Sequence, residues 1–237
     1  MNHPTMHPRL AERAKEPRYA IPEAASFIHR PSSTVRRWAL GNVRKRHGQV
    51  TRDQPLIVTD GLPYSPVPLS FLNLLELRFL GAYRSRMPLQ SIRRALEYAG
   101  DELKVDRPLL SLEFKARGKE LFLRFATEGG DNYLVNASRR GQIEIAWPTS
   151  ADEFIDTLDY DEREHSAFRW WPLGRQQPVI IDTTLNGGIP STALSGVRTN
   201  AIAVHRGEGL DLPEIADDVG ATIDEVRAAL KFERVAA

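Results

Sequence analysis

The spacing of four residues between positions 25 and 38 fits a helix-turn-helix. Such a unit needs a small residue where its helices cross, a turn residue that tolerates left-handed backbone, and buried apolar residues three apart on the second helix. Ala25, His29, Val35 and Trp38 stand at these places. Histidine is among the residues enriched at positive φ, so it can replace the usual glycine in the turn. We therefore predict two short helices within residues 19–41.

The second predicted helix would turn its polar side chains outward. Ser32 or Ser33 would cap it, and burial of Val35 and Trp38 would leave its other side chains facing solvent. Arginine makes bidentate contacts with guanine in the major groove, and serine and threonine reach phosphates or bases. The outward side chains are therefore suited to DNA, although two arginines can also form a merely solvated helix face. The outward residues are Ser33, Thr34, Arg36 and Arg37.

A small wing is predicted directly after these helices. Residues 42–60 contain two β-type runs around His47-Gly48, with residues 56–58 as a compact strand. Basic residues of the wing would neutralise phosphates, and positions 1–58 hold 11 basic against 4 acidic residues. We therefore predict a DNA-binding surface from both parts, made of Ser32, Ser33, Thr34, Arg36, Arg37, Arg44, Lys45 and Arg46.

The charge of the chain is divided between its two halves. The net charge is +1, but residues 1–107 hold 18 basic against 10 acidic residues, and residues 108–237 hold 14 against 21. A basic half favours a nucleic-acid partner and an acidic half a different one. The chain has no cysteine, which excludes disulfides and a cysteine nucleophile and fits a reducing compartment. With no apolar leader and no apolar run of membrane-spanning length, we expect a cytoplasmic protein without a membrane segment.

The remaining sequence predicts an α+β fold. Apolar residues at helical spacing predict a helix opened by Ser70 and a second one stopped by Gly100. From residue 109 apolar and polar positions alternate on both sides of Arg117-Gly118 and again of Arg140-Gly141, which predicts two antiparallel β-hairpins. An acidic helix at 150–165 and a β run at 179–181 would follow, before further helices at the C-terminus.

These elements suggest four regions. Residues 1–17 are expected to be a flexible tail, and residues 18–107 a winged helix-turn-helix domain with two further helices. Residues 108–177 would be a connecting region of hairpins, and residues 178–237 a C-terminal helical domain that serves a protein contact, dimerisation or both.

A second helix-turn-helix pattern near the C-terminus serves as an internal comparison. Ala216, Gly220 and Val226 occupy the corresponding places, and Thr222 with Glu225 forms a capping box. The outward positions are nevertheless acidic, and carboxylates repel phosphate. We therefore expect this unit to contact a protein or a second copy rather than DNA. The acidic residues are Asp217, Asp218, Asp224 and Glu225.

The N-terminal motif resembles the winged helix-turn-helix of the MerR type, through Tyr19, Glu23, Ala24, Ala25 and the run Thr34 to Trp38. Residues 178–232 resemble the domain of unknown function 433, through Asp182, Gly188, Pro190, Gly196, Arg198 and the segment from Leu212 to Leu230. The order of the two is similar to that of long VapB-type antitoxins, which partner PIN-domain ribonuclease toxins. The resemblance implies an antitoxin that neutralises such a toxin and represses its own operon.

The same resemblance directs attention to a stretch rich in arginine and tryptophan. A PIN active site is acidic, and antitoxins of this type typically block it with basic or aromatic residues, which are also frequent interface hot spots. The candidate toxin-binding residues are Arg169, Trp170, Trp171 and Arg175, with Arg198 and Arg206 as alternates. Trp170 and Trp171 could equally fill the core, where large aromatic residues usually lie.

Enzymatic chemistry has little support in the sequence. The six histidines are scattered along the chain, and His165 lacks the i, i+4 partner that a helical zinc site requires. No nucleophile motif or phosphate-binding loop is present. We expect no enzyme, cofactor or metal. The partners would be operator DNA and the toxin, and the protein would form a homodimer or a hetero-oligomer with the toxin, because helix-turn-helix proteins read paired half-sites. A MerR-like regulator with a ligand held by the sheet at 109–147 remains the main alternative, and a nuclease the third.

Overall fold

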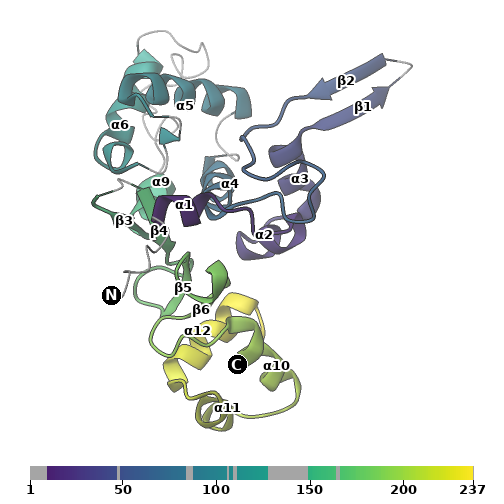
Figure 1. Ribbon diagram of the computed structural model, residues 1–237, viewed down its shortest axis with the longest axis vertical. Helices are drawn as coiled ribbons and strands as arrows, with labels where there is room; N and C mark the ends of the chain where they lie inside the picture. Colours follow the sequence, from purple (N-terminus) through teal and green to yellow (C-terminus); the bar gives the residue numbers. More distant parts are fainter. Residues whose placement is uncertain are drawn as a thin grey trace, which may run out of the picture. The chain divides into compact units, whose positions relative to one another are not determined.

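The computed structural model describes residues 10–46, 49–83, 88–105, 107–108, 111–127, 149–163 and 166–236 (Figure 1). The chain forms two compact units. The first contains Ala14–Asp156 and Tyr160–Ala167. The second contains Thr157–Asp159 and Phe168–Ala237, together with the N-terminal residues up to Arg13. Within the segment predicted as a flexible tail, Leu10–Lys15 forms helix α1, in which Ala14 is buried.

The first unit begins with the predicted helix pair. Helix α2 spans Ile21–Phe27 and helix α3 spans Ser32–Leu40. Between them His29 has a φ of 54°, in the left-handed region that the sequence pattern required. Ala25, Val35 and Trp38 are buried, as predicted. The spacing of small, left-handed and apolar positions is therefore sufficient to locate this helix-turn-helix.

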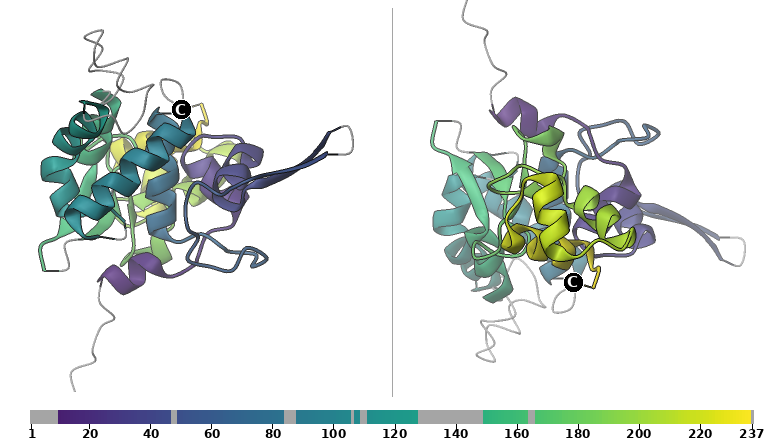
Figure 2. Two further views of the ribbon diagram at one scale, coloured as in Figure 1. Left: turned by 90° about the horizontal axis from the view of Figure 1, so that it is seen from above. Right: turned by 90° about the horizontal axis from the view of Figure 1, so that it is seen from below.

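An antiparallel wing follows α3. Strands β1 (Asn42–Arg46) and β2 (Gln49–Asp53) pair in a register that joins Asn42 to Asp53 and Arg46 to Gln49. The hairpin extends away from the helices of its unit, as Figure 2 shows from two directions. The predicted strand at 56–58 is wrong: those residues form bends between β2 and α4. Their apolar run resembles a strand, but Leu56 instead donates its N–H to the carbonyl of Trp38, which ends the sheet.

The described part of the first unit also contains three longer helices, α4 (Phe71–Tyr83), α5 (Leu89–Leu103) and α6 (Leu112–Thr127), and the shorter α9 (Thr149–Asp156). Ser70 opens α4, as predicted, because its Oγ accepts the N–H of Asn73 at 3.1 Å. Gly100 does not stop α5. The helix continues to Leu103 and ends at Lys104, whose left-handed backbone donates its N–H to the carbonyl of Gly100.

Helix α6 replaces the first predicted hairpin. Alternation of apolar residues around Gly118 suggested two strands, but Phe114, Gly118, Leu121 and Phe125 are buried together at helical spacing. Ser111 opens the helix, since its Oγ accepts the N–H of Phe114 at 3.1 Å. The pattern thus satisfied both periods, and the serine cap was the signal for the helix. The second predicted hairpin, around Arg140-Gly141, lies outside the described residues.

The small antiparallel sheet lies later in the chain than predicted. Its strands are β3 (Leu158–Asp161), β4 (Ser166–Trp170), β5 (Val179–Asp182) and β6 (Ser191–Thr192), in this order across the sheet. β5 agrees with the predicted run at 179–181. The predicted acidic helix is shorter, because α9 ends at Asp156 and the chain continues as β3. The α+β class, with a helix-turn-helix, a small sheet and C-terminal helices, is confirmed.

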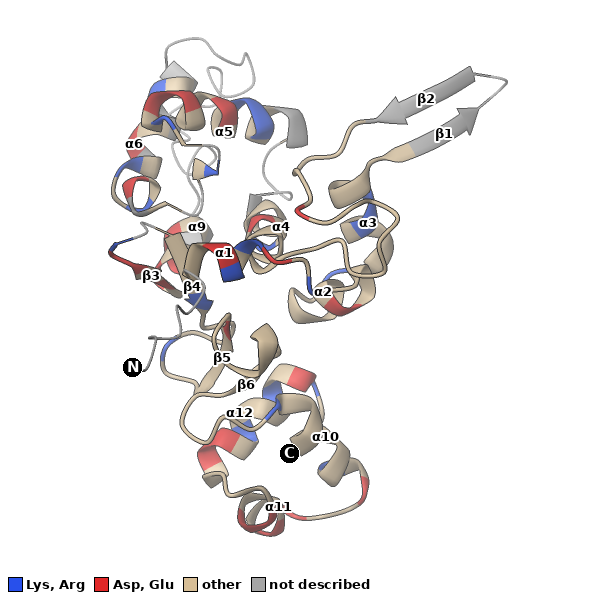
Figure 3. Ribbon diagram, in the orientation of Figure 1, with Lys and Arg blue, Asp and Glu red and all other residues tan. Residues whose placement is uncertain are grey.

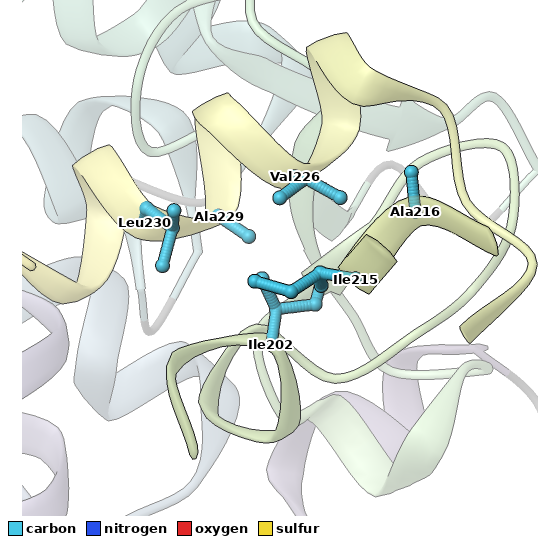
Figure 4. Close-up of a cluster of buried hydrophobic side chains, with 6 residues drawn as sticks. All are labelled: Ile202, Ile215, Ala216, Val226, Ala229 and Leu230. Atoms are coloured by element: carbon cyan, nitrogen blue, oxygen red, sulfur yellow. The ribbon is translucent and has the colours of Figure 1, made fainter. Parts of the chain in front are cut away.

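Three helices end the chain: α10 (Thr199–Gly207), α11 (Leu212–Val219) and α12 (Ile223–Glu233), after a short 3-10 turn, η2, at Asn186–Gly188. Their apolar faces meet in a cluster of side chains from all three helices, drawn in Figure 4. Its members are Ile202, Ile215, Ala216, Val226, Ala229 and Leu230. None of the helices in the described ranges combines the length and apolar character that crossing a lipid bilayer requires.

Candidate nucleic-acid interface

Helix α3 carries the residues predicted to read DNA. Ser32, Ser33 and Arg36 are exposed, while Thr34 and Arg37 are half-buried. Val35 and Trp38 hold the opposite face of the helix in the core. The guanidinium groups of Arg36 and Arg37 form no ion pair or hydrogen bond with a described residue. Both cations are therefore available to an external anion, and α3 contains no acidic residue (Figure 3).

The predicted serine cap is wrong. Pro31 is the N-cap residue of α3, and its carbonyl accepts the N–H groups of Thr34 and Val35. The helix therefore begins one residue earlier than a serine cap requires, with Ser32 and Ser33 inside the first turn. Neither serine side chain caps the helix, so both hydroxyl groups lie exposed in its first turn. The free N–H groups and the helix dipole at this end favour the binding of phosphate.

Contacts with the rest of the first unit fix the orientation of the helix-turn-helix. Arg30, at the end of the turn, donates from Nη2 to the carbonyl of Gly81 in α4 at 2.8 Å. The N–H groups of Arg18 and Tyr19 both donate to the carbonyl of Leu69, at 2.8 and 2.9 Å. The segment before α2 is therefore held to Leu69, which precedes α4, and the turn between α2 and α3 is held to the end of α4. The orientation of α3 thus does not depend on its own short turn alone.

The basic residues of the wing lie on β1. In the register of the hairpin Arg44 is opposite Thr51, Lys45 is opposite Val50, and Arg46 is opposite Gln49. β1 follows α3 after Gly41, and the hairpin extends away from the helices, so these three residues lie on the part of β1 that is farther from α3. The sequence prediction thus placed α3 and the wing correctly as elements, and the roles of their side chains remain a proposal.

A buried polar network, which the sequence analysis missed, supports the segment between the wing and α4. Arg107 Nη2 contacts Asp60 Oδ1 at 2.7 Å, and its Nη1 lies 3.6 Å from Glu76 Oε2. Asn73 joins the same group: its Oδ1 accepts the N–H of Asp60, and its Nδ2 donates to Val58 O and to Glu76 Oε2. The four side chains come from distant positions, so no local motif indicated them.

Burial raises the pKa of the Glu76 carboxyl to about 7. The nearby guanidinium of Arg107 and the hydrogen bond from Asn73 oppose this shift, and the charge of Asp60 adds to it. Arg107 is thus shared between two carboxylates, one of which is held in an environment that disfavours its charge. The network fixes the loop that precedes α4. Leu69 of this loop forms an antiparallel bridge with Tyr19.

The second unit holds the residues predicted to bind a toxin. Arg169 Nε contacts Asp182 Oδ2 at 2.6 Å, and its Nη1 lies 3.6 Å from Asp159 Oδ2. Arg175 Nη2 contacts Asp159 Oδ1 at 2.7 Å and the carbonyl of Leu158 at 3.0 Å. Both guanidinium groups therefore serve internal carboxylates, so their charge is largely balanced within the unit.

The aromatic and remaining basic candidates differ in exposure. Trp170 is 2% exposed and packs in the core, as the alternative interpretation of the sequence expected. Trp171 is half-buried and donates from Nε1 to Asp159 Oδ2 at 2.9 Å, with Arg175 over its ring. Arg198 is exposed, at the start of α10. Arg206 donates to the carbonyls of Leu210 and Ala236. The structure thus separates a buried Trp170 from accessible Trp171 and Arg198.

The C-terminal helix pair has helix-turn-helix geometry and an acidic surface. Gly220 is left-handed, with φ of 66°, and Val226 is buried. The capping box of Thr222 and Glu225 is present. Asp217, Asp218 and Asp224 are exposed, as expected, and Figure 3 shows carboxylates along α11.

Glu225 does not face outward, contrary to the sequence prediction. It is 1% exposed, because its carboxylate accepts N–H groups from a turn thirty residues earlier in the chain as well as from its own cap. Burial alone would raise its pKa, but backbone hydrogen bonds from Ser195, Thr222 and Leu194 outweigh this effect and lower the pKa of the Glu225 carboxyl. Across the described ranges, no cluster of three or more histidine and carboxylate side chains could hold a metal ion.

Comparisons with known proteins agree with this arrangement. A family model described as "Putative DNA-binding HTH domain" matches residues 17–96. "Putative antitoxin VapB45" of Mycobacterium tuberculosis (strain ATCC 25618 / H37Rv) is 25% identical over 224 residues, which cover 90% of this chain and 92% of the relative. The crystal structure of Rv2018 from Mycobacterium tuberculosis is 24% identical and covers 91% of this chain and 98% of that chain, with a TM-score of 0.71.

The match at residues 17–96 covers α2, α3, the wing, α4 and part of α5, so it coincides with the elements that present the basic surface. The similarity to the antitoxin extends over both units. The resemblance of residues 178–232 to the domain of unknown function 433 stays a prediction. The chain therefore carries a helix-turn-helix domain of the DNA-binding type and is similar over most of its length to a VapB-type antitoxin.

Proposed function

We propose that the protein is an antitoxin of a type II toxin–antitoxin system. It binds and neutralises a PIN-domain ribonuclease toxin and represses its own operon by binding DNA. In this proposal the protein is a non-enzymatic regulator of the cytoplasm, where it meets both partners. The support comes from the similarity to a VapB-type antitoxin over both units and from the matching helix-turn-helix domain.

The observation that carries the DNA-binding part is the surface of α3. Its outward side chains are hydroxyl groups and guanidinium groups without internal partners among the described residues, over a fully buried opposite face. In the proposed complex α3 enters the major groove, where Arg36 and Arg37 contact guanine edges. Ser32, Ser33 and Thr34 contact phosphates or bases, and the wing residues Arg44, Lys45 and Arg46 neutralise phosphates.

The second helix-turn-helix provides the contrast that makes this proposal specific. The α11–α12 pair has the better turn, with a left-handed glycine and a complete capping box, yet it exposes Asp217, Asp218 and Asp224. Backbone geometry alone would assign DNA to both pairs. Because phosphates are repelled by carboxylates, the charge of the outward face assigns DNA to α2–α3.

Toxin binding is proposed for the second unit. Among the residues predicted from the sequence, Trp171, Arg175 and Arg198 retain accessible surface, and the Arg169 side chain, although paired with Asp182, is 33% exposed. We propose that these four contact the toxin directly and that the buried Trp170 supports them from the core. We also propose a dimer, since helix-turn-helix proteins read two half-sites about one helical turn of DNA apart.

The ligand-responsive regulator gains no support from the fold. It required a ligand-binding sheet at 109–147, and the described part of that range, residues 111–127, contains helix α6 with its apolar face buried. No observation on the described residues favours it over the antitoxin.

Arg36→Ala combined with Arg37→Ala tests the proposal. We expect at least about thirtyfold weaker binding to a fragment of the protein's own promoter, because each of the two bidentate arginine contacts contributes about 1–3 kcal/mol. Binding to the PIN-domain protein encoded by the adjacent gene should be unchanged. Both affinities are measured by titration with labelled DNA and labelled toxin at one fixed salt concentration, because binding to DNA depends on salt.

Lys115→Ala combined with Arg117→Ala is the matched control, because it removes the same charge from exposed positions of α6 in the same unit. This control should bind the promoter like the wild type. Loss of both DNA and toxin binding in the Arg36/Arg37 variant would show that the helix pair is structural. Failure of the wild-type protein to bind the adjacent gene's product, or to prevent RNA cleavage by it, would overturn the antitoxin proposal.

A further inference from the structure

We propose that the tip of the C-terminal unit formed by Leu194, Ile223 and Asp224 is a docking surface for the toxin, and we call it the Leu194 surface. Its partner site would be an apolar pocket with a basic rim. This inference rests on the proposed function and adds a second contact region, separate from the arginine and tryptophan residues predicted from the sequence.

Leu194 is 80% exposed although it belongs to a tightly ordered turn. The N–H of Thr192 donates to Val197 O at 2.8 Å, and the N–H of Val197 donates to Thr192 Oγ1 at 2.8 Å. Gly196 has a φ of 69°, which allows its N–H to return to the carbonyl of Thr192. The hydrogen-bonded backbone of the turn therefore keeps the large apolar side chain of Leu194 exposed to solvent.

Glu225 fixes the same turn to helix α12. Its Oε1 accepts the N–H groups of Leu194 and Ser195 at 2.8 and 2.9 Å, and its Oε2 accepts the N–H of Thr222 at 3.0 Å. One carboxylate thus binds the turn and the start of α12 together. Ile223, the first residue of α12, is 39% exposed. The exposed side chains of Leu194 and Ile223 therefore belong to two segments that hydrogen-bond to the same buried carboxylate, that of Glu225.

The platform beneath this surface is packed. Val226, one turn after Thr222, lies in the apolar cluster of Figure 4, and Val197 at the end of the turn packs against the same cluster. Both segments that carry the exposed residues are thus attached to the core of the unit. Because the surface is ordered before binding, a partner gains apolar contact without a large entropy cost of ordering it.

The charge around the surface identifies the class of partner. Residues 199–236 hold eight acidic and four basic residues, a net charge of −4. Asp224 beside Ile223 is exposed and pairs with Arg227 Nη1 at 3.2 Å, so the acidic excess of the unit comes from its other carboxylates, among them the exposed Asp217 and Asp218. A second copy placed symmetrically on this face would bring carboxylates together, and DNA would be repelled. A ribonuclease must carry a basic surface to hold RNA phosphates, so its charge complements this face.

Leu194→Asp in the full-length protein tests the inference. The probe is the PIN-domain protein of the adjacent gene, and its affinity is measured by calorimetry. We expect binding to weaken at least about tenfold, because aspartate removes the apolar contact that leucine would make and brings an uncompensated charge into an apolar pocket. Leu62→Asp is the matched control: Leu62 is 58% exposed in the first unit, and its replacement should change the affinity by less than about twofold.

Thermal unfolding and a second variant distinguish a lost contact from a folding defect. The thermal midpoint of Leu194→Asp should equal that of the wild type, because the side chain is exposed, and promoter binding should persist. Leu194→Ala, which cannot introduce a buried charge, should weaken toxin binding in the same direction. Loss of the thermal transition in both variants would show that Leu194 supports the fold instead, and would overturn the inference.

The outcomes separate the inference from the proposed function. If the wild type binds the toxin and Leu194→Asp binds it equally well, the Leu194 surface is not the contact and the antitoxin function stands. If the free wild type is a dimer that Leu194→Asp converts to a monomer with unchanged toxin affinity, the occupant is a second copy. If the wild type binds no toxin, both proposals fall together.

Discussion

Glu225 is the residue on which the C-terminal unit depends most directly. A carboxylate that is 1% exposed would be costly if it lacked partners, but it accepts three backbone N–H groups and the hydroxyl of Thr222. Charge-assisted hydrogen bonds of this kind are about twice as strong as neutral ones. The residue therefore performs two tasks, since it caps α12 and also closes the turn at Leu194 and Ser195.

Glu225→Gln should lower the free energy of unfolding by about 1–3 kcal/mol at pH 7, because an amide replaces one accepting oxygen with a donor that faces N–H groups. The folded-state pKa of Glu225 is lowered, so its stabilisation is present above the unfolded value of about 4.3 and is lost as the pH falls through the folded value. Urea unfolding at pH 7 and pH 3 should therefore show a difference between the two proteins that shrinks at pH 3.

The matched control is Glu214→Gln, at the same position of the capping box of α11 but on the exposed surface, where it accepts the N–H of Asp211 at 2.8 Å. Its effect should stay below about 1 kcal/mol. An equal loss in both variants would mean that capping, rather than the link to the Leu194 turn, explains the stability. A difference that persists unchanged at pH 3 would contradict the assignment of the stabilisation to the ionised carboxylate.

Helix α6 depends on the absence of a side chain at one position. A Cβ atom at Gly118 would lie 2.9 Å from three ring carbons of Phe114, closer than real Cβ atoms approach. That ring is fully buried and meets Phe79 edge to face at 6.2 Å, so it has little room to move. The glycine is thus part of the packing of α6 and α4, although glycine generally destabilises a helix interior.

Gly118→Ala should destabilise the protein by about 1–3 kcal/mol, despite the higher helix propensity of alanine, because overpacking of the ring outweighs the gain. Gly207→Ala is the comparison, because Gly207 ends α10 with nothing near its would-be Cβ atom. That change should leave stability unchanged or raise it by up to about 1 kcal/mol. Thermal unfolding of both variants measures the two effects, and equal behaviour would disprove the steric argument.

The elements also show what local sequence can determine. The α2–α3 pair and the wing were predictable, because their spacing and turn signals lie within about thirty residues of each other. Helix α6 was not, since residues 110–125 satisfy both a two-residue and a helical period, and Phe79, against which its Phe114 packs, lies 35 residues earlier in the chain. The positions of the buried Glu225 and the half-buried Arg107 were equally hidden, because their partners lie some thirty residues or more away.

On the scale of the whole molecule, the DNA-binding unit extends well beyond the predicted boundary at residue 107. Phe79 of α4 packs against Phe114 of α6 and Phe154 of α9, with ring centroids 6.2 and 6.1 Å apart. Arg78 lies over the ring of Phe154 at 5.8 Å. The helices after residue 107 therefore complete the core against which the helix-turn-helix is fixed.

Truncation after Arg107 should consequently unfold the DNA-binding unit, because Phe79 loses both of its aromatic partners. The loss of one aromatic side chain from a core typically lowers the free energy of unfolding by about 3–5 kcal/mol. A fragment that ends after Asp156 keeps α6 and α9 and should retain promoter binding. Circular dichroism and promoter titration of the two fragments decide between these outcomes. Equal promoter binding by both would mean that residues 17–96 are stable without the later helices.

The path of the chain between its units has a consequence for proteolysis. Thr157–Asp159 belongs to the second unit although the chain on both sides of it belongs to the first. One cleavage after Ala167 would leave every residue of the first unit on the N-terminal fragment. Asp159 would stay on that fragment too, whereas Trp171 and Arg175, to which it binds, would lie on the C-terminal fragment. The second unit therefore needs an unbroken chain through β4, where the burial of Ala167 protects this bond from proteases.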